Sequence, residues 1–249
     1  MGPVDISVMI SCFNEEGSIV PTIEFMVGAL TRSELSWEII VVDDASRDAS
    51  AECVRQFLHA RSELPIRLCT HETNRGLVYG IFEAVRAAHG QYFWVVAGDN
   101  NVDQETAVKL LSHIGIADII IPYVLDYTGR SLHRRVISKA YAFLVRVLSG
   151  CPVRYYNGSS IHRRSHLIWL EDKINGFAIS ADCITRLFDH GCTFVEVPVV
   201  YRERLEGKSS ALSARNFRDV AKFMLRLAMR RINKMTTPAT LASQKGELG

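Results

Sequence analysis

Short apolar runs alternate with longer stretches of helical spacing along the first half of the chain. Residues 38–42 form one such run, apolar after Glu38, which is typical of a central parallel strand covered on both faces. Strands are predicted on the same grounds at 5–11, 66–70, 92–97 and 118–122, and helices at 19–30, 48–60, 77–88 and 103–114. This order predicts an α/β fold with a mainly parallel sheet and helices on both faces.

The second half of the chain is less regular and much more basic. It contains a predicted helix at 136–148, a predicted strand at 194–200 and a long predicted helix at 216–232. Residues 1–129 carry 8 Lys/Arg and 18 Asp/Glu, a net charge of −10, whereas the remainder carries 21 and 9, a net charge of +12. We therefore expect an α/β domain over 1–212 and a basic amphipathic helix with a polar tail over 213–249.

Three features of the sequence bear on the cellular location of the protein. Its apolar runs are far shorter than the roughly 20 residues of a spanning helix, and its N-terminus lacks a basic region followed by an apolar run. The six cysteines are scattered without a C-x-x-C pair, which favours free thiols. We expect a cytoplasmic chain that does not cross a membrane by itself.

Polar residues follow four successive predicted strands, at the end where parallel sheets bind ligands. The motifs are S-C-F-N-E-E (11–16), V-V-D-D-A-S (41–46), N-R-G-L (74–77) and A-G-D-N-N (97–101). A single carboxylate after a strand is often only a helix N-cap, and Ser46 is a plausible cap for the helix that follows it. Four such motifs in succession indicate a ligand site instead.

Together with E-V-P (196–198) and R…G-K-S (204–209), these motifs resemble those of the family 2 glycosyltransferases of the GT-A fold, over about residues 5–212. Within that family the sequence is most similar to the dolichol- and polyprenyl-phosphate mannose synthases. The resemblance implies a GT-A-type sheet, with a basic C-terminal helical lobe. It also implies an enzyme that moves a sugar, with inversion, from a nucleoside diphosphate (UDP or GDP) to a polyprenyl phosphate.

The resemblance assigns the nucleotide to residues of the first three motifs. Phe13 and Glu15 would lie along the nucleoside, the ring on the base and the carboxylate on ribose hydroxyls. Asp43 and Asp44 would read base and ribose, since carboxylates accept hydrogen bonds from base N–H groups. Gly76 would let the backbone approach the nucleotide, although a glycine there is also explained by a simple turn.

The metal motif departs from the family pattern, because Ala97 stands where the first Asp of D-x-D is expected. Asp99 matches the second Asp. With Asn101 or Asn100 beside it, one carboxylate can still hold Mg²⁺ or Mn²⁺, since these ions take further ligands from substrate phosphates and water. The ion would neutralise the leaving diphosphate.

The basic residues of the second half would contact phosphates. The segment 130–164 holds eight Lys/Arg and no acid, and Arg134 and Ser138 match the residues that hold the acceptor phosphate in the resembled branch. Pro122 replaces an earlier arginine of that branch, unless Arg130 takes its place. The plain alternative for this basic run is a solvated face.

A later basic motif would close over the diphosphate. It contains Arg204 and Lys208, and Lys208 can substitute for a family lysine because Ser210 stands at the usual position. Asp182 matches an acidic residue that can act as a base for sugar-hydroxyl acceptors, but a phosphate acceptor is already ionised and needs no base. Asp182 would then only orient the basic cluster.

The predicted C-terminal helix carries seven Lys/Arg and one Asp between 215 and 234, with apolar residues at helical spacing. It could lie on an anionic membrane near a lipid acceptor, or pack on its own domain with a solvated basic face. We therefore expect peripheral contact at the inner face of the membrane, or a membrane-protein partner. Nucleic acid is not an expected partner, because the sequence contains no motif that reads nucleic acids.

Two rival functions remain open at this point. One is a family 2 transferase that acts on a sugar hydroxyl in cell-surface glycan synthesis. The other is a non-catalytic nucleotide-sugar-binding protein, which the missing first Asp and the altered lysine would favour. The sugar, the base and the oligomeric state are not encoded in any motif that we identify.

Overall fold

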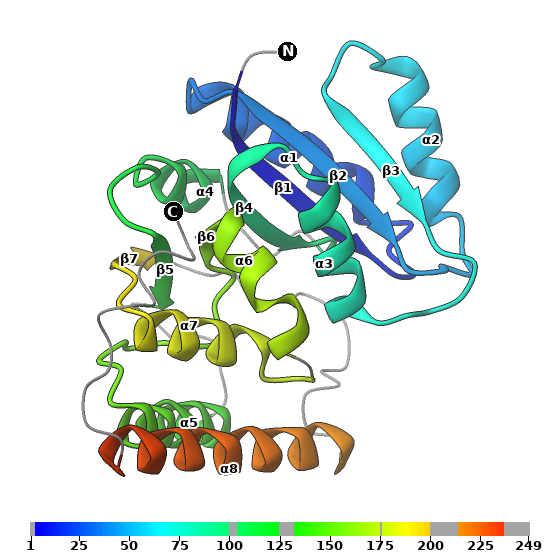
Figure 1. Ribbon diagram of the computed structural model, residues 1–249. Coiled ribbons are helices and arrows are strands. Elements are labelled where there is room, and N and C mark those ends of the chain that lie inside the picture. Colours follow the sequence, from blue (N-terminus) through cyan, green and yellow to red (C-terminus); the bar gives the residue numbers. More distant parts are fainter. Residues whose placement is uncertain (1–2, 100–103, 125–131, 175, 200–213, 237–249) are drawn as a thin grey trace.

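The computed structural model describes the chain except for residues 1–2, 100–103, 125–131, 175, 200–213 and 237–249. Its described strands form one seven-stranded sheet in the order β3-β2-β1-β4-β6-β5-β7 (Figure 1). Neighbouring strands are parallel except where β6 pairs with β4 and β5. The strands are β1 (Val4–Cys12), β2 (Trp37–Asp43), β3 (Ile66–Thr70), β4 (Gly90–Ala97), β5 (Ile119–Val124), β6 (Ile161–Arg163) and β7 (Phe194–Val199).

Helices cover both faces of this sheet, because successive residues of the central strands point to opposite sides. Val8 and Ile10 of β1 join one buried apolar cluster with residues of α1 and α4, whereas Met9 joins a second cluster with residues of α3, α6 and α7. The helices are α1 (Ile19–Arg32), α2 (Ser50–Ala60), α3 (Leu77–Ala87), α4 (Gln104–Leu111), α5 (Leu132–Ser149), α6 (Arg164–Leu170), the 3₁₀ turn η1 (Glu171–Lys173), α7 (Ile179–Asp189) and α8 (Ala214–Thr236).

The predicted fold class is confirmed, and each predicted strand and helix is present with its ends shifted by a few residues. Four elements were not predicted, namely β6, α6, η1 and α7. The predicted cap of α2 is wrong: the helix begins at Ser50, and its N-cap residue is Ala49. Ser46 instead accepts a hydrogen bond from the backbone of Asn14.

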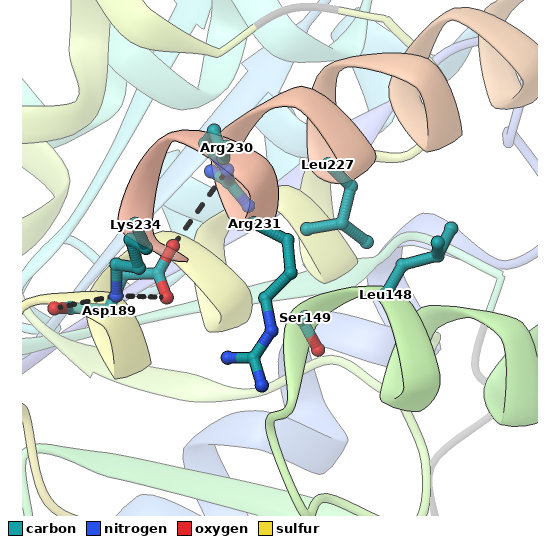
Figure 2. Close-up of a pocket in the computed structure, with 7 residues that line it drawn as sticks. All are labelled: Leu148, Ser149, Asp189, Leu227, Arg230, Arg231 and Lys234. Atoms are coloured by element: carbon teal, nitrogen blue, oxygen red, sulfur yellow. Dashed lines mark hydrogen bonds and ion pairs between the residues drawn. The ribbon is translucent and has the colours of Figure 1, made fainter. Parts of the chain in front are cut away.

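Helix α8 packs against α5 and α7 through one of its faces. Phe223 and Leu227 are buried in the same apolar cluster as Val145 of α5. In Figure 2, Arg230 and Lys234 of α8 bind Asp189 at the end of α7, with the Lys234 Nζ 2.6 Å from Asp189 Oδ1. Packing on its own domain, one of the two arrangements expected for this helix, therefore accounts for one face of α8.

The proposed domain boundary at residue 212 lies outside the described residues and stays a prediction. Among the helices of the described part, none combines the length and the apolar character needed to cross a membrane.

Close packing between β1 and β4 depends on Gly90. A Cβ at this position would lie 2.4 Å from the backbone N of Ser7 and 2.7 Å from the carbonyl C of Ile6, so one strand would have to move. We expect Gly90→Ala to lower the free energy of unfolding by about 2 kcal/mol, the usual cost of overpacking a core. Gly17→Ala is the control, because nothing lies within 4 Å of its Cβ position. Urea unfolding measures both, and equal stability of the two variants would contradict this packing.

Candidate functional site

The strand register brings four loops together at one edge of the sheet. Cys12 at the end of β1 is paired with Asp43 at the end of β2, and Ser11 is paired with Ala97 at the end of β4. Asp43 is in turn paired with Thr70 at the end of β3. The loops that carry the four polar motifs therefore leave the sheet side by side, as predicted.

Backbone hydrogen bonds continue this alignment beyond the strands. The N–H of Asp44 donates to Cys12 O, and that of Gly98 donates to Ser11 O, each at 2.9 Å. The N–H of His71 donates to Asp43 O, also at 2.9 Å. The first residue of each loop is thus fixed against the neighbouring strand, and side chains from different motifs start from defined positions.

The loops after β1 and β2 hold each other. Asn14 Oδ1 accepts from the backbone N of Arg47 at 2.8 Å, and Asn14 N donates to Ser46 Oγ at 2.9 Å. Glu15 N donates to Ser50 Oγ at 2.8 Å. Asn14 and Ala45 both have positive φ (56° and 60°), which is uncommon for residues with a side chain and occurs where the surroundings impose it.

Asp44 joins the β2 loop to the β3 loop. Its Oδ1 accepts from the backbone N of Arg75 at 2.7 Å, and its Oδ2 accepts from Gly76 N at 2.8 Å. Gly76 has φ 85°, a conformation that glycine adopts without strain, and it caps the N-terminus of α3. Burial acts to raise the pKa of Asp44, but the hydrogen bonds from His71, Arg75 and Gly76 outweigh it and lower this pKa.

His71 lies between two carboxylates. Its Nδ1 is 2.8 Å from Asp44 Oδ1 and its Nε2 is 2.6 Å from Glu83 Oε2 of α3, and its side chain is only 5% exposed. Burial acts to lower the pKa of His71, but the two carboxylates outweigh it and raise this pKa. His71 therefore ties the β2 loop to α3 through both of its ring nitrogens.

Asp43 differs from Asp44 because one of its carboxylate oxygens accepts no hydrogen bond from the described part of the chain. Its Oδ2 accepts weakly from Ser46 N at 3.3 Å, whereas its Oδ1 is buried and has no hydrogen-bond partner among the described residues. A buried carboxylate oxygen without a partner is costly. It marks a place where a ligand N–H or O–H would be bound.

The other residues predicted to bind the nucleotide or its metal ion lie in the loops after β1 and β4. Phe13 follows Cys12, the register partner of Asp43, and its ring is 46% exposed. Glu15 accepts from Ser18 Oγ at 2.7 Å and is half-buried. Asp99 is half-buried just after Gly98, whose carbonyl accepts from Thr22 Oγ1 at 3.0 Å. Structure thus brings Phe13, Glu15, Asp43, Asp44, Gly76 and Asp99 to one edge of the sheet.

Ser138 lies in a separate place, on α5. It lines an open groove of about 200 Å³ together with Phe143 on the same helix and Tyr155 across from it. Three basic residues also line this groove, namely Lys139, Arg146 and Arg154. Arg134 belongs to the first turn of α5, but its side chain lies outside what the structure describes.

Asp182 on α7 is buried among arginines, with only 3% of its side chain exposed. Its Oδ1 accepts from Arg186 Nε at 2.8 Å and from Arg230 Nη1 at 3.2 Å, and Arg226 Nη2 is 3.7 Å from Oδ2. This position favours the second role predicted for Asp182, the orientation of a basic cluster. Arg226 and Arg230 of α8 are therefore turned toward Asp182 and do not belong entirely to an outward basic face.

Five candidates fall outside the described residues, namely Asn100, Asn101, Arg130, Arg204 and Lys208. Sequence reasoning missed His71 and Glu83. The sequence did contain one signal for His71. It is the first residue after β3, and the other polar motifs also lie directly after a strand.

The sequence matches the model of the family described as "Glycosyl transferase family 2" over residues 7–185, more than half of the chain. This chain belongs to glycosyl transferase family 2. The match spans the loops that follow β1, β2, β3 and β4, which carry the four polar motifs.

The curated relatives that this glycosyltransferase resembles are named as enzymes of dolichol-phosphate or polyprenyl-phosphate sugars. A dolichol-phosphate mannosyltransferase of Mycosarcoma maydis is 29% identical over 82% of this chain and 72% of its own length. Another from Saccharomyces cerevisiae is 26% identical over 83% and 80%. A dodecaprenyl-phosphate galacturonate synthase of Rhizobium johnstonii is 24% identical over 65% of this chain and 48% of its own length, so this chain spans about half of that relative.

Solved structures confirm the fold of the transferase. Glucosyl-3-phosphoglycerate synthase from Mycobacterium tuberculosis, in complex with uridine diphosphate, aligns with a TM-score of 0.67 at 18% identity, over 91% of this chain and 80% of that one. A second structure of that enzyme contains Mn²⁺ and UDP-glucose with phosphoglyceric acid, and aligns with a TM-score of 0.65 over 95% and 81% at 16% identity. These alignments establish a GT-A-like fold.

The raised pKa of His71 gives a defined pH dependence of stability. A raised folded-state pKa contributes stability that is fully present below the unfolded pKa and is lost as the pH rises through the folded pKa. We expect His71→Gln to cost about 2 kcal/mol near pH 6, the size of hydrogen bonds to charged groups, and less at pH 9. Urea unfolding of the transferase at both pH values measures this.

His59→Gln is the control for that experiment, because His59 is an exposed histidine at the end of α2. It should change stability little at either pH. A cost of His71→Gln that grew between pH 6 and pH 9 would contradict the bridge between Asp44 and Glu83.

Asp182 gives a test that separates an orienting role from catalysis. Asp182→Asn should lower the free energy of unfolding by about 3 kcal/mol, because it leaves partly buried guanidinium groups without the charge of their buried carboxylate. Asp172→Asn, at an exposed acid of η1, should cost almost nothing. Full stability of Asp182→Asn combined with loss of sugar transfer would instead identify Asp182 as a base.

Proposed function

We propose that this transferase moves a sugar from a nucleoside diphosphate (UDP or GDP) to the phosphate of a polyprenyl lipid, with inversion at the anomeric carbon. The observation that carries the proposal is the buried Oδ1 of Asp43, which has no hydrogen-bond partner among the described residues, together with the exposed Phe13, which follows the register partner of Asp43. It offers an acceptor for a base N–H next to a surface on which a base can stack. The names of the relatives support the lipid phosphate as acceptor.

The two adjacent aspartates have different roles in this proposal. Asp43 binds the nucleotide directly. Asp44 is already engaged by His71 and by the backbone of Arg75 and Gly76, so it positions the loop on which the nucleotide rests. Glu15 exchanges its bond to Ser18 for a ribose hydroxyl.

A divalent ion fits the site only with the nucleotide present. The described part of the chain holds no cluster of three His, Cys, Asp or Glu side chains that could bind a metal by itself. Asp99 supplies one carboxylate, Asn101 is a further oxygen ligand proposed from the motif, and Mg²⁺ or Mn²⁺ completes its shell with phosphate oxygens and water. The ion would offset negative charge on the leaving diphosphate.

Transfer then requires little proton chemistry from the protein. A lipid phosphate is already ionised, so its oxygen attacks the anomeric carbon while the bond to the diphosphate breaks, and no base is needed. Arg134 and Ser138 hold the acceptor phosphate in this proposal, and Arg204 and Lys208 contact the diphosphate. The rate enhancement is then mainly electrostatic. In this proposal Asp182 has a structural role, because its ion pairs with arginines of α8 hold α7 and α8 together.

Because the acceptor is a lipid, we propose that the protein works peripherally at a membrane surface. The nucleotide sugar must be present on the same side of that membrane. This arrangement places the soluble donor and the lipid acceptor within reach of one site.

Calorimetric titration with UDP, GDP, CDP and ADP tests the donor site, each with and without Mn²⁺. One diphosphate should bind with micromolar affinity in the presence of the ion. Asp43→Asn should weaken that binding about tenfold, the size of one hydrogen bond to a charged group. Asp99→Asn should remove the effect of Mn²⁺, and Mn²⁺ without nucleotide should give no binding.

Glu63→Gln serves as the matched control, because this exposed carboxylate lies before β3, at the opposite end of the strands. It should bind nucleotide like the wild type. If no nucleotide bound to the folded protein, the donor site would be refuted and a partner-binding role favoured. If a nucleotide bound but the sugar moved only to sugar hydroxyls, the lipid-phosphate acceptor would be refuted.

A further inference from the structure

Two neighbouring helices carry most of the large apolar side chains that the described part of the chain exposes to solvent. Phe143 is 65% exposed on α5 and Leu225 is 62% exposed on α8. The other exposed apolar residues of these two helices are Val136, Ile137, Leu144, Val147, Met229 and Ile232. A water-soluble surface rarely gathers so many unless something covers them.

The spacing of these residues places most of them on one stripe of each helix, with Ile137 and Leu144 along the edge of the α5 stripe. Leu225, Met229 and Ile232 are related by steps of four and three residues, and Val136, Phe143 and Val147 by steps of seven and four. The opposite sides of the helices are apolar too, but buried, through Val145 of α5 and through Phe223 and Leu227 of α8. Folding therefore does not use the outer stripes.

The two helices lie side by side in one layer. They contact each other, and in Figure 1 they lie together on the far side of α7 from the strands. Figure 2 shows Leu148 of α5 and Leu227 of α8 facing each other across this contact. The inner sides of the helices are thus used up in packing.

The charges on these two helices indicate which kind of partner would cover the exposed apolar stripes. Helix α5 contains no acidic residue and α8 contains only Asp219. Arg226 and Arg230 are turned toward Asp182, and Lys234 is paired with Asp189. Among the residues whose side chains the structure describes, Lys139, Arg146, Arg218, Lys222 and Arg231 are also exposed cations of these two helices.

An apolar stripe flanked by cations and almost without acids fits an anionic bilayer, where side chains enter the acyl boundary and cations meet headgroups. A second copy of the same face would bring like charges together, because a two-fold interface pairs a surface with itself. The groove beside Phe143 adds Lys139 and Arg146 at the same edge of α5.

We propose that α5 and α8 form one membrane-docking face, which lies flat on an anionic lipid surface with Phe143 and Leu225 inserted. The proposal deepens the proposed function, since it names the surface by which a transferase with a lipid acceptor meets the membrane. Docking needs no nucleotide and no acceptor, so it is tested independently of the transfer reaction.

Flotation of the full-length chain with protein-free vesicles tests the docking face. The vesicles are phosphatidylcholine alone or an equal mixture with phosphatidylglycerol. Wild-type protein should float with the mixed vesicles and much less with the neutral ones. The double variant Phe143→Ser/Leu225→Ser should bind the mixed vesicles at least about tenfold more weakly, because it removes two inserted apolar side chains. Arg146→Glu/Lys222→Glu should also bind about tenfold more weakly to the mixed vesicles.

Matched controls come from other parts of the chain. Ile116→Ser/Ile168→Ser replaces two exposed apolar residues outside α5 and α8, and Arg32→Glu/Arg61→Glu reverses two exposed charges at the ends of α1 and α2. Both control variants should float like the wild type. Nucleotide titration of every variant without vesicles shows that the fold and the donor site are intact.

Three results would overturn the proposal. Wild-type protein that binds nucleotide but floats with neither vesicle has no lipid-docking face. Equal flotation of Phe143→Ser/Leu225→Ser and the wild type would place any docking elsewhere. A wild-type dimer in light scattering that becomes monomeric in that variant would show that a second copy covers this face.

Discussion

The parallel pairing of β1 with both of its neighbours is the constraint on which the site depends. It sets Cys12 beside Asp43 and Ser11 beside Ala97, so three loops leave the sheet at the same level. Side chains alternate between the two faces of a strand, so a slip of one residue would exchange Met9 with Val8 or Ile10 between the two apolar clusters. The burial of both faces thereby fixes the register, and the register fixes the site.

Two adjacent aspartates show how this framework divides identical residue types between structure and binding. Asp43 ends β2 and is almost fully buried, whereas Asp44 begins the loop and turns toward the β3 loop and α3. Asp44 satisfies its oxygens with donors of the protein. Asp43 retains one acceptor oxygen, at the energetic cost that an unpaired buried group carries. Such a cost is common at places where a ligand completes the hydrogen bonding.

The first half of the fold could be predicted because its signals are local. Apolar runs such as 38–42, helical spacing, and polar motifs after each strand are all visible within a few residues. Contacts between distant residues could not be predicted. Ser46 resembles a helix cap in sequence but bonds the β1 loop, and Arg226 and Arg230 resemble a solvated face but pair with Asp182. The strand β6 has only three residues and runs antiparallel, so it carries almost no periodic signal.

The burial of Val145, Phe223 and Leu227 in one cluster with residues of the sheet has a consequence for how an acceptor is found. Helices anchored in this way cannot swing relative to the strand ends, so the height of the site above whatever surface they rest on is fixed by the fold. If these helices rest on a membrane and the acceptor is a lipid phosphate, as we propose, the encounter of the site with the acceptor is a search in two dimensions. Its frequency follows the mole fraction of acceptor in the membrane plane, and it is insensitive to the volume of the surrounding solution.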